Sequence, residues 1–252
     1  MMSNVKIRKA ISYSIDREEM IDAVYGRYNP AYSYVAPAIT FNGSSYRDQV
    51  GEIMEDEYNE YVGDPDKIVA LFQEGLDELG VETPIEDITL TYLTSGSTTE
   101  VQAEREYIQQ SLEETLGLTV ELSVAGDTSL FIADRNEGNY DFFLGGWYSD
   151  YNDPLDFLYT NYTDAYGMSF GGYSNTDYDA LADQLVGETD MDKRLDIYKQ
   201  MEQILLLDDC AFAPIYYATK QVLLQNWVKD YRTSSFGASA EFIWTYIDGK
   251  NQ

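Results

Sequence analysis

Apolar residues follow a helical spacing through the first part of the chain. Residues 5–25 are predicted to form two short helices, because Asp16 and Glu19 make a capping box that begins the second one. A longer helix is predicted from Asp64, an N-cap residue that precedes a proline. Residues 27–62, between these helices, are rich in tyrosine and interrupted by proline and glycine, so we expect an irregular segment. Its rings either pack against the rest of the protein or form a binding surface.

The middle of the chain alternates between strand and helix patterns. Strands are predicted at residues 88–93, 118–124 and 140–147. A helix that begins at Ser97, with Glu100 three residues later, separates the first two strands, and a short helix at 128–137 separates the second and third. This β-α-β-α-β order implies parallel strands with right-handed crossovers, and it places ligand contacts near the carboxyl ends of the strands.

After Pro154 the pattern becomes helical again. Helices are predicted at about residues 155–160, 176–186 and 190–208. Residues 213–218 are predicted to form a buried strand. The final stretch, 225–252, contains many aromatic rings and little periodicity, so we expect it to pack against another part of a longer protein. Met1 and Met2 directly precede a predicted helix, which also suggests a fragment whose missing targeting signals carry no information.

Charge excludes several classes of function. The chain has 45 acidic and 16 basic side chains, a net charge of −29, and no histidine. Such a chain is not expected to bind nucleic acid or an anionic membrane face, because both depend on Lys and Arg. The absence of histidine excludes Ser-His-Asp triads and HExxH zinc sites. The single cysteine, Cys210, follows an apolar run and is expected to be a packed free thiol.

Aromatic residues make up 14% of the chain, and hydrophobic residues make up 44%, which is typical of a globular protein. Acidic groups beside exposed rings suit the recognition of amines, peptides or sugars. An acidic surface that only keeps the protein soluble explains the same composition.

The densest polar cluster follows the third predicted strand and covers residues 145–156. Gly145 and Gly146 allow another backbone to approach closely, and Trp147 is followed three residues later by Asp150. A carboxylate beside an aromatic ring is a good receptor for an ammonium group. The alternative is an ordinary strand-to-helix turn capped at Asp153.

Other chemistries fit this cluster less well. A calcium loop counted from Asp150 has Pro154 at its fifth position and Asn161 at its twelfth, so the EF-hand pattern fails. Paired carboxylates of a glycoside hydrolase are available, but such pairs arise by chance among 45 acidic residues. The turn at residues 94–99 lacks the phosphate-binding glycine patterns and is predicted to be an ordinary capped turn.

Four stretches of the chain together resemble one family. They are Val5–Arg17, Tyr140–Phe157, Gly172–Leu181 and the run from Lys193 to Tyr217. In order and mutual spacing they are similar to motifs in the C-terminal half of extracytoplasmic solute-binding proteins of the peptide/nickel class, which serve ABC importers. Each motif alone is weak, but the ordered set covers nearly the whole chain, and the Asp-Tyr-Asn-Asp-Pro run is most like the oligopeptide-binding branch.

The resemblance implies an α/β fold: a periplasmic-binding-protein-like lobe with a β-α-β-α-β parallel core plus peripheral helices. Residues 1–218 are expected to form the second lobe of a two-lobed protein that closes on its ligand, and residues 219–252 to return toward the hinge and the missing first lobe. The implied protein is not an enzyme and has no cofactor or metal. It is extracytoplasmic, often lipid-anchored, monomeric, and delivers a peptide to a membrane permease.

The resemblance also implies the ligand contacts. Asp150 corresponds to the residue that pairs with the peptide α-amino group, and the neighbouring backbone pairs with the peptide as an added strand would. The expected ligand-binding residues are Asp150, Gly145, Gly146, Trp147, Tyr148, Tyr151 and Asn152. Some relatives carry Arg at the position of Leu144 to meet the peptide carboxylate, so the partner of that carboxylate is open here. Other solutes of the class, such as a dipeptide, a metal chelate or a sugar, stay as alternatives.

Overall fold

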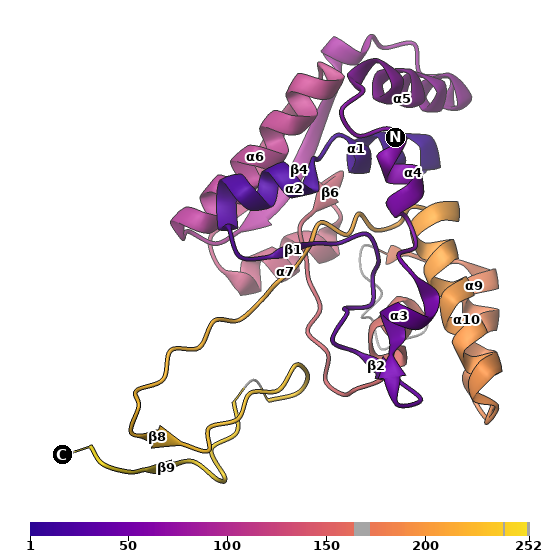
Figure 1. Ribbon diagram of the computed structural model, residues 1–252. Helices are drawn as coiled ribbons and strands as arrows, with labels where there is room; N and C mark the ends of the chain where they lie inside the picture. Colours follow the sequence, from indigo (N-terminus) through magenta and orange to yellow (C-terminus); the bar gives the residue numbers. More distant parts are fainter. Residues whose placement is uncertain (164–171, 239, 251–252) are drawn as a thin grey trace.

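The computed structural model describes residues 1–163, 172–238 and 240–250. Its centre is a parallel sheet with strand order β5-β4-β6, formed by β4 (Thr89–Ser95), β5 (Thr119–Ala125) and β6 (Phe142–Phe143). The crossovers are α6 (Thr99–Leu116) and α7 (Thr128–Glu137), both labelled in Figure 1. The predicted α/β fold with a β-α-β-α-β core is therefore confirmed.

Two details of this core differ from the prediction. The third strand pairs with β4 only at Phe142 and Phe143 rather than over 140–147, because Gly145 and Gly146 offer no side chains to pack and the chain leaves the sheet before them. The first crossover helix is capped by Thr98 instead of Ser97, since the Thr98 side chain accepts the Val101 N–H. The turn at 94–99 is thus the ordinary capped turn that the sequence favoured.

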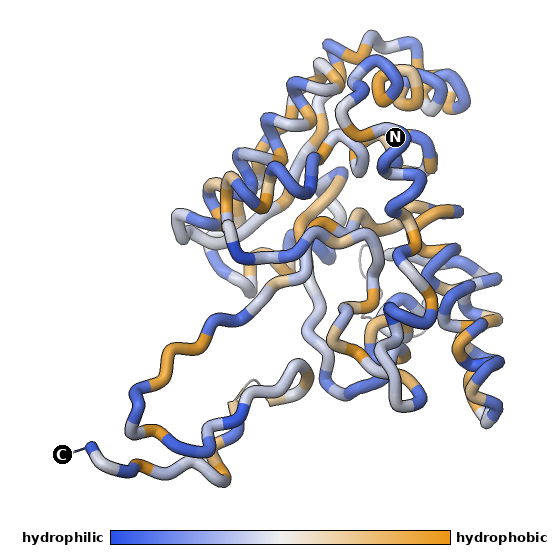
Figure 2. Tube along the Cα trace, in the orientation of Figure 1, coloured by the Kyte–Doolittle hydropathy of each residue, from blue (hydrophilic) through white to orange (hydrophobic). Residues whose placement is uncertain are grey.

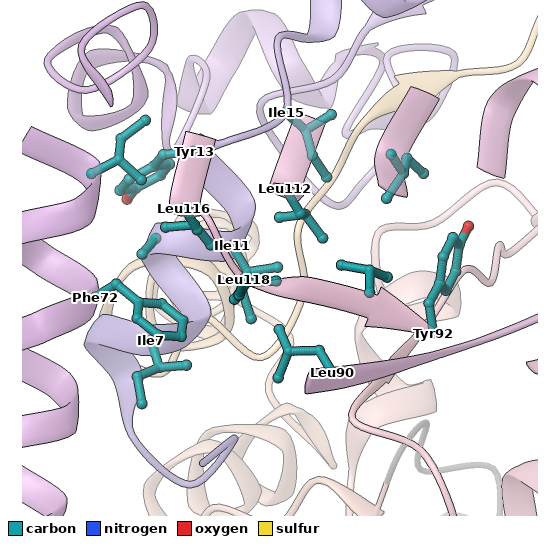
Figure 3. Packing of buried hydrophobic residues seen from close by; sticks show 14 of the residues in the cluster. Ile7, Ile11, Tyr13, Ile15, Phe72, Leu90, Tyr92, Leu112, Leu116 and Leu118 are labelled. Carbon is teal, nitrogen blue, oxygen red and sulfur yellow. The ribbon is translucent and has the colours of Figure 1, made fainter. Parts of the chain in front are cut away.

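The first hydrophobic core lies between the sheet and the N-terminal helices. It joins α1 (Val5–Tyr13), α5 (Pro65–Leu79) and α6 to β4 and β5, and Figure 3 shows Ile7 and Phe72 beside Leu90 and Leu118. A Cβ on Gly75 of α5 would lie 2.7 Å from Cγ1 of Ile7. Glycine therefore sets how closely α1 and α5 approach.

The second hydrophobic core is largely helical. It contains α8 (Leu155–Leu158), α9 (Thr176–Leu185) and α10 (Met191–Gln203), extended by a π-helical turn at Ile204–Asp208, with α3 (Tyr46–Val50) packed beside them. These helices agree with the predicted ranges, except that α8 is followed by a 3-10 turn at Tyr159–Asn161. A buried ion pair between Arg47 and Glu202 ties α3 to α10, with a nitrogen–oxygen distance of 2.8 Å.

The tyrosine-rich segment 27–62 is more ordered than predicted and packs against both cores. It contains β1 (Asn29–Pro30), β2 (Thr40–Phe41), β3 (Ser44–Ser45), α3 and α4 (Glu55–Asn59). Tyr32, Tyr46 and Tyr58 are buried, so these rings serve packing, the first of the two predicted alternatives. Strand β1 pairs antiparallel with β7 (Tyr216–Tyr217). The predicted buried strand 213–218 is thus only two residues long and partly exposed, because it lies in a two-stranded sheet.

Arg17 joins the N-terminal helices to this region. It lies at the start of α2 (Arg17–Met20), which continues as a π-helical turn at Ile21–Tyr25, and its side chain is fully buried. Its guanidinium donates to the carbonyl oxygens of Ala31 and Pro214 at 3.1 and 2.7 Å, and it lies over the Tyr58 ring. Burial lowers the pKa of Arg17.

The C-terminal segment from residue 219 leaves both cores as an extended arm, drawn from orange to yellow in Figure 1. Its two short strands are β8 (Val228–Lys229) and β9 (Tyr246–Ile247), and within the described part of the chain they pair only with each other. Figure 2 shows hydrophobic stretches along this arm in orange. Several of its large apolar side chains are exposed, including Leu223 at 98% and Ile243 at 82%. Within the described ranges, no helix has the length and apolar character needed to cross a membrane.

Candidate functional site

The predicted ligand-binding residues lie on a connection between the two cores. After β6 the chain runs toward the β2 region before it enters α8 (Figure 1). Gly145 and Gly146 are exposed, and Trp147 is partly buried against the second core. The segment therefore leaves the carboxyl end of a sheet strand, where open α/β sheets bind ligands.

Four carboxylates lie in this region, and three of them have partners within the protein. Asp141 accepts the Thr91 N–H at 2.8 Å, next to the sheet. Asp153 accepts the Leu155 N–H and the Tyr198 hydroxyl, and so begins α8. The side chain of Asp150 is exposed and accepts no hydrogen bond and forms no ion pair with any of the described residues. It is therefore the carboxylate of the four that is available to a ligand.

Asp156 holds the segment from beneath. Its Oδ2 accepts the indole N–H of Trp147 at 2.8 Å and the backbone N–H of Asp150 at 3.0 Å. Asp156 is only 6% exposed, so these hydrogen bonds are protected from water. One buried carboxylate thus orients the aromatic ring and fixes the backbone that carries Asp150.

The backbone beside Asp150 has unused hydrogen-bonding groups. Within the described residues, the N–H and C=O groups of Gly145, Gly146 and Tyr148 make no hydrogen bond. Exposed backbone groups of this kind can pair with an incoming extended chain. The arrangement offers a row of peptide groups beside a negative charge.

A cavity of about 610 Å³ opens beside the segment. Gly145, Gly146 and Trp147 line it, together with Leu144. The lining also includes Arg8, Tyr34, Tyr92, Tyr173, Phe212 and Ile215. Asp150, Tyr148, Tyr151 and Asn152 lie outside this lining, so the structure separates the predicted residues into a cavity wall and an outer group.

Each member of the outer group besides Asp150 has its own surroundings. The Asn152 side chain accepts the Thr40 N–H and donates to the Thr40 hydroxyl, so its amide ties the segment to β2. The Tyr148 hydroxyl donates to the Ser234 carbonyl at 3.1 Å. Tyr151 is half exposed. Its partial burial raises the pKa of its hydroxyl, and the negative charges of three nearby aspartates add to this effect.

The cavity lining holds one cationic residue among those described, Arg8. Its guanidinium donates to the backbone carbonyls of Met2, Asp209 and Cys210. Leu144 on the wall offers no charge. Among the described residues Cys, Asp and Glu side chains form no group of three that could hold a metal ion.

These features have counterparts in known proteins. A family model described as bacterial extracellular solute-binding proteins, family 5, middle region, matches residues 1–169. The chain belongs to this family. The family consists of solute-binding proteins and not of enzymes.

Relatives in the family carry peptide-binding names. The oligopeptide-binding protein OppA of Bacillus subtilis is 30% identical over 91% of this chain, and the dipeptide-binding protein DppE of the same organism is 31% identical over 88%. The chain spans 39% of the length of each, so it corresponds to less than half of these relatives.

Solved structures agree with the fold. Listeria monocytogenes OppA bound to peptide superposes with a TM-score of 0.77 at 31% identity, over 97% of this chain and 45% of that one. The substrate-binding domain of an oligopeptide ABC transporter from Bacillus anthracis gives a TM-score of 0.81 at 23% identity and shows the fold alone, over 96% of this chain and 45% of that one.

Two residues that shape the site have no distinguishing signal in the sequence. The sequence does not distinguish Asp156 from the other carboxylates of residues 145–156, although Trp147, nine positions earlier, supplies the N–H that it accepts. Ser149 is 2% exposed, and its hydroxyl donates to the Tyr151 carbonyl, which shapes the turn after Asp150. A buried serine between two exposed tyrosines gives no signal in the sequence pattern.

Proposed function

We propose that this chain is the part of an ABC-importer substrate-binding protein that captures the amino-terminal end of an oligopeptide. The observation that carries the proposal is the pairing of an exposed, unpartnered Asp150 carboxylate with the unpaired backbone groups of Gly145, Gly146 and Tyr148. Asp150 receives the peptide α-amino group, and the neighbouring backbone bonds the peptide as an added strand. The names of the relatives support this ligand class.

Trp147, with Gly145 and Gly146, forms the wall of a cavity that takes a peptide side chain. Its ring is held by Asp156 and needs no rearrangement to present an apolar face. Tyr151 stands exposed on the outer side of the segment, and Asn152 keeps the turn against β2. Tyr151 is thus a candidate ligand contact, whereas the Asn152 side chain supports the turn.

The two-lobe arrangement is part of the same proposal. Residues 1–218 form the second lobe, and residues 219–252 return toward a first lobe supplied by the remaining length that the relatives have. The exposed apolar side chains of the arm, such as Leu223 and Ile243, support a partner surface of this kind. The whole protein acts outside the cytoplasm as a monomer, anchored to lipid or free in the periplasm, and passes its peptide to a membrane permease without chemistry or cofactor.

The test replaces Asp150 with asparagine in the full-length protein. Asp150→Asn keeps the shape and removes the charge, so affinity for a free-amine peptide identified by mass spectrometry of carried ligands falls by about 1.5–3 kcal/mol. Asp66→Asn, at an exposed position in the first turn of α5, is the matched control and leaves calorimetric affinity unchanged. An Asp150→Asn protein that binds as tightly as the control would show that Asp150 does not anchor the amine.

We also propose that the described residues of the cavity lining do not hold the peptide carboxylate. Leu144 carries no charge, and the donors of Arg8 bond backbone carbonyls. Arg8→Met in the full-length protein should therefore change the ratio of affinities for a peptide and its C-terminal amide by less than about threefold, a difference of under 1 kcal/mol. A change in that ratio by more than about 30-fold in Arg8→Met would contradict this assignment.

A further inference from the structure

Among the described residues, the arm touches the ligand segment, residues 145–152, at one place. The Gly237 N–H donates to the Ser149 carbonyl at 2.7 Å, and the Ser234 carbonyl accepts the Tyr148 hydroxyl at 3.1 Å. In Figure 1 the tip of the yellow loop lies beside the chain that descends from β6. The arm reaches the candidate site through residues 234–237, which we name the brace loop.

The brace loop has a defined base and an internal turn. The Glu241 N–H donates to the Arg232 carbonyl at 3.0 Å, which closes the loop where it leaves the arm. Within it, the Phe236 N–H donates to the Ser234 hydroxyl at 3.3 Å. These bonds give the loop a shape of its own against the ligand segment.

Gly237 meets a steric requirement at this contact. Its φ is +63°, a left-handed conformation that glycine adopts without strain. A Cβ at this position would lie 3.2 Å from the Asp150 carbonyl oxygen, closer than ordinary van der Waals contact. Any side chain here would push either the brace loop or the Asp150 backbone away.

The contact falls on the backbone that carries Asp150. Asp156 fixes the Asp150 N–H on the core side at 3.0 Å, and Gly237 fixes the preceding carbonyl, that of Ser149, on the outer side. The two together hold the peptide group before Asp150 between a buried carboxylate and the brace loop. The backbone groups of Gly145, Gly146 and Tyr148 make no hydrogen bond to the described residues of the loop, so the loop does not use the groups proposed to pair with the peptide.

We infer that Gly237 is a positioning residue for Asp150, and that the brace loop holds the amine anchor in register with the backbone groups that pair with the peptide. This inference rests on the proposed function, because it assigns Gly237 a role in that same site. The loop contributes no atom to the ligand. It sets where the Asp150 carboxylate stands.

The experiment measures amide hydrogen exchange by NMR on the 252-residue chain without ligand. In the unaltered chain the Gly237 amide exchanges at least about tenfold more slowly than in an unfolded peptide, because it is bonded to Ser149. Gly237→Ala speeds exchange at the Asp150 amide by about tenfold, since the segment loses its outer support. Tyr148→Phe, which removes the second contact, gives a smaller increase at the same amide.

Gly249→Ala is the matched control. Gly249 has φ +72° in the same arm and no atom within 4 Å of its added Cβ, so alanine there imposes the same backbone strain without the close contact. Equal exchange at the Asp150 amide in the two alanine variants, or an unprotected Gly237 amide, would overturn the inference. If Gly237→Ala fails to fold, the protection of Gly237 in the unaltered chain and the Tyr148→Phe variant decide the question.

Peptide affinity in the full-length protein separates the two proposals. With both correct, Gly237→Ala weakens binding about tenfold and Gly249→Ala does not. If Asp150→Asn leaves affinity unchanged while Gly237→Ala still speeds exchange at the Asp150 amide, the proposed function fails and the brace stands. If Asp150→Asn weakens binding but Gly237→Ala changes neither exchange nor affinity, the brace fails alone.

Discussion

The buried pair of Arg47 and Glu202 offers the sharpest test of how the helical core is held. Glu202 is fully buried, and it accepts hydrogen bonds from the N–H groups of Tyr34 and Val35, the Tyr46 hydroxyl and Arg47, all between 2.8 and 3.0 Å. It therefore fastens α10 to the segment that carries Tyr34, a wall residue of the cavity. The perturbation is Glu202→Gln.

The expected loss of stability follows from the hydrogen bonds of Glu202 that a glutamine can and cannot keep. The Oε1 position bonded to Tyr34, Val35 and Arg47 is retained as an amide oxygen, whereas the second oxygen becomes an NH₂ that faces Tyr46 and Arg47. Burial on its own lowers the pKa of the Arg47 guanidinium. The charge and hydrogen bonds of Glu202 more than offset this effect, so the pKa of Arg47 is raised. Without the carboxylate a buried cation stays unpaired, which costs about 3–5 kcal/mol.

The assay is urea unfolding followed by circular dichroism at pH 7. Glu202→Gln should lower the free energy of unfolding by about 3–5 kcal/mol, and adding Arg47→Met should recover about 2 kcal/mol or more, because the cation is then gone. Glu60→Gln, at an exposed pair with Lys67, is the control and should leave the midpoint unchanged. A loss of unfolding free energy below about 1 kcal/mol in Glu202→Gln, or a double variant less stable than the single one, would refute the reasoning.

Two further predictions concern titrating groups. Burial raises the pKa of the Cys210 thiol from 9.0 to about 11, so the folded chain should react with Ellman's reagent at pH 8 about 100-fold more slowly than the urea-unfolded chain; equal rates would show that the thiol is accessible. Burial also raises the pKa of Glu104, despite the hydrogen bond from Tyr216, so its contribution to stability is complete below about pH 4.5 and is lost as the pH rises through the raised value. In urea titrations, the free energy of unfolding should therefore fall less between pH 4.5 and pH 7 for Glu104→Gln than for the unaltered chain. Plots of this free energy against pH that run parallel for the two proteins would contradict the raised pKa.

The sequence predicted the parallel core because its signals are local. Alternating residues in 88–93 and 118–124 and the helical spacing between them each depend on neighbours a few positions away. The extent of β6 could not be predicted, because Phe142 and Phe143 pair with a strand about fifty residues earlier and the glycines then end the pairing. Local pattern shows that a strand exists but not how far its partner reaches.

The candidate site shows the same division. Asp150, Asp153 and Asp156 look alike in the sequence, and the resemblance to a family singled out the first. The structure supplies the physical distinction: Asp153 accepts the hydroxyl of Tyr198, 45 positions away, and Asp156 accepts the Trp147 indole, so both are committed to the fold. The contact of Gly237 with the ligand segment spans still more of the chain and left no local pattern to detect.

The buried guanidinium of Arg17 has a consequence for the order in which the chain assembles. Its acceptors include the Ala31 carbonyl nearby and the Pro214 carbonyl, 197 residues downstream. A ribosome delivers Arg17 early and Pro214 late, so a nascent chain must keep this cation hydrated until the distant acceptor emerges. The N-terminal helices therefore reach their final packing around Arg17 only after Pro214 has been synthesised, and this step joins residues 197 positions apart.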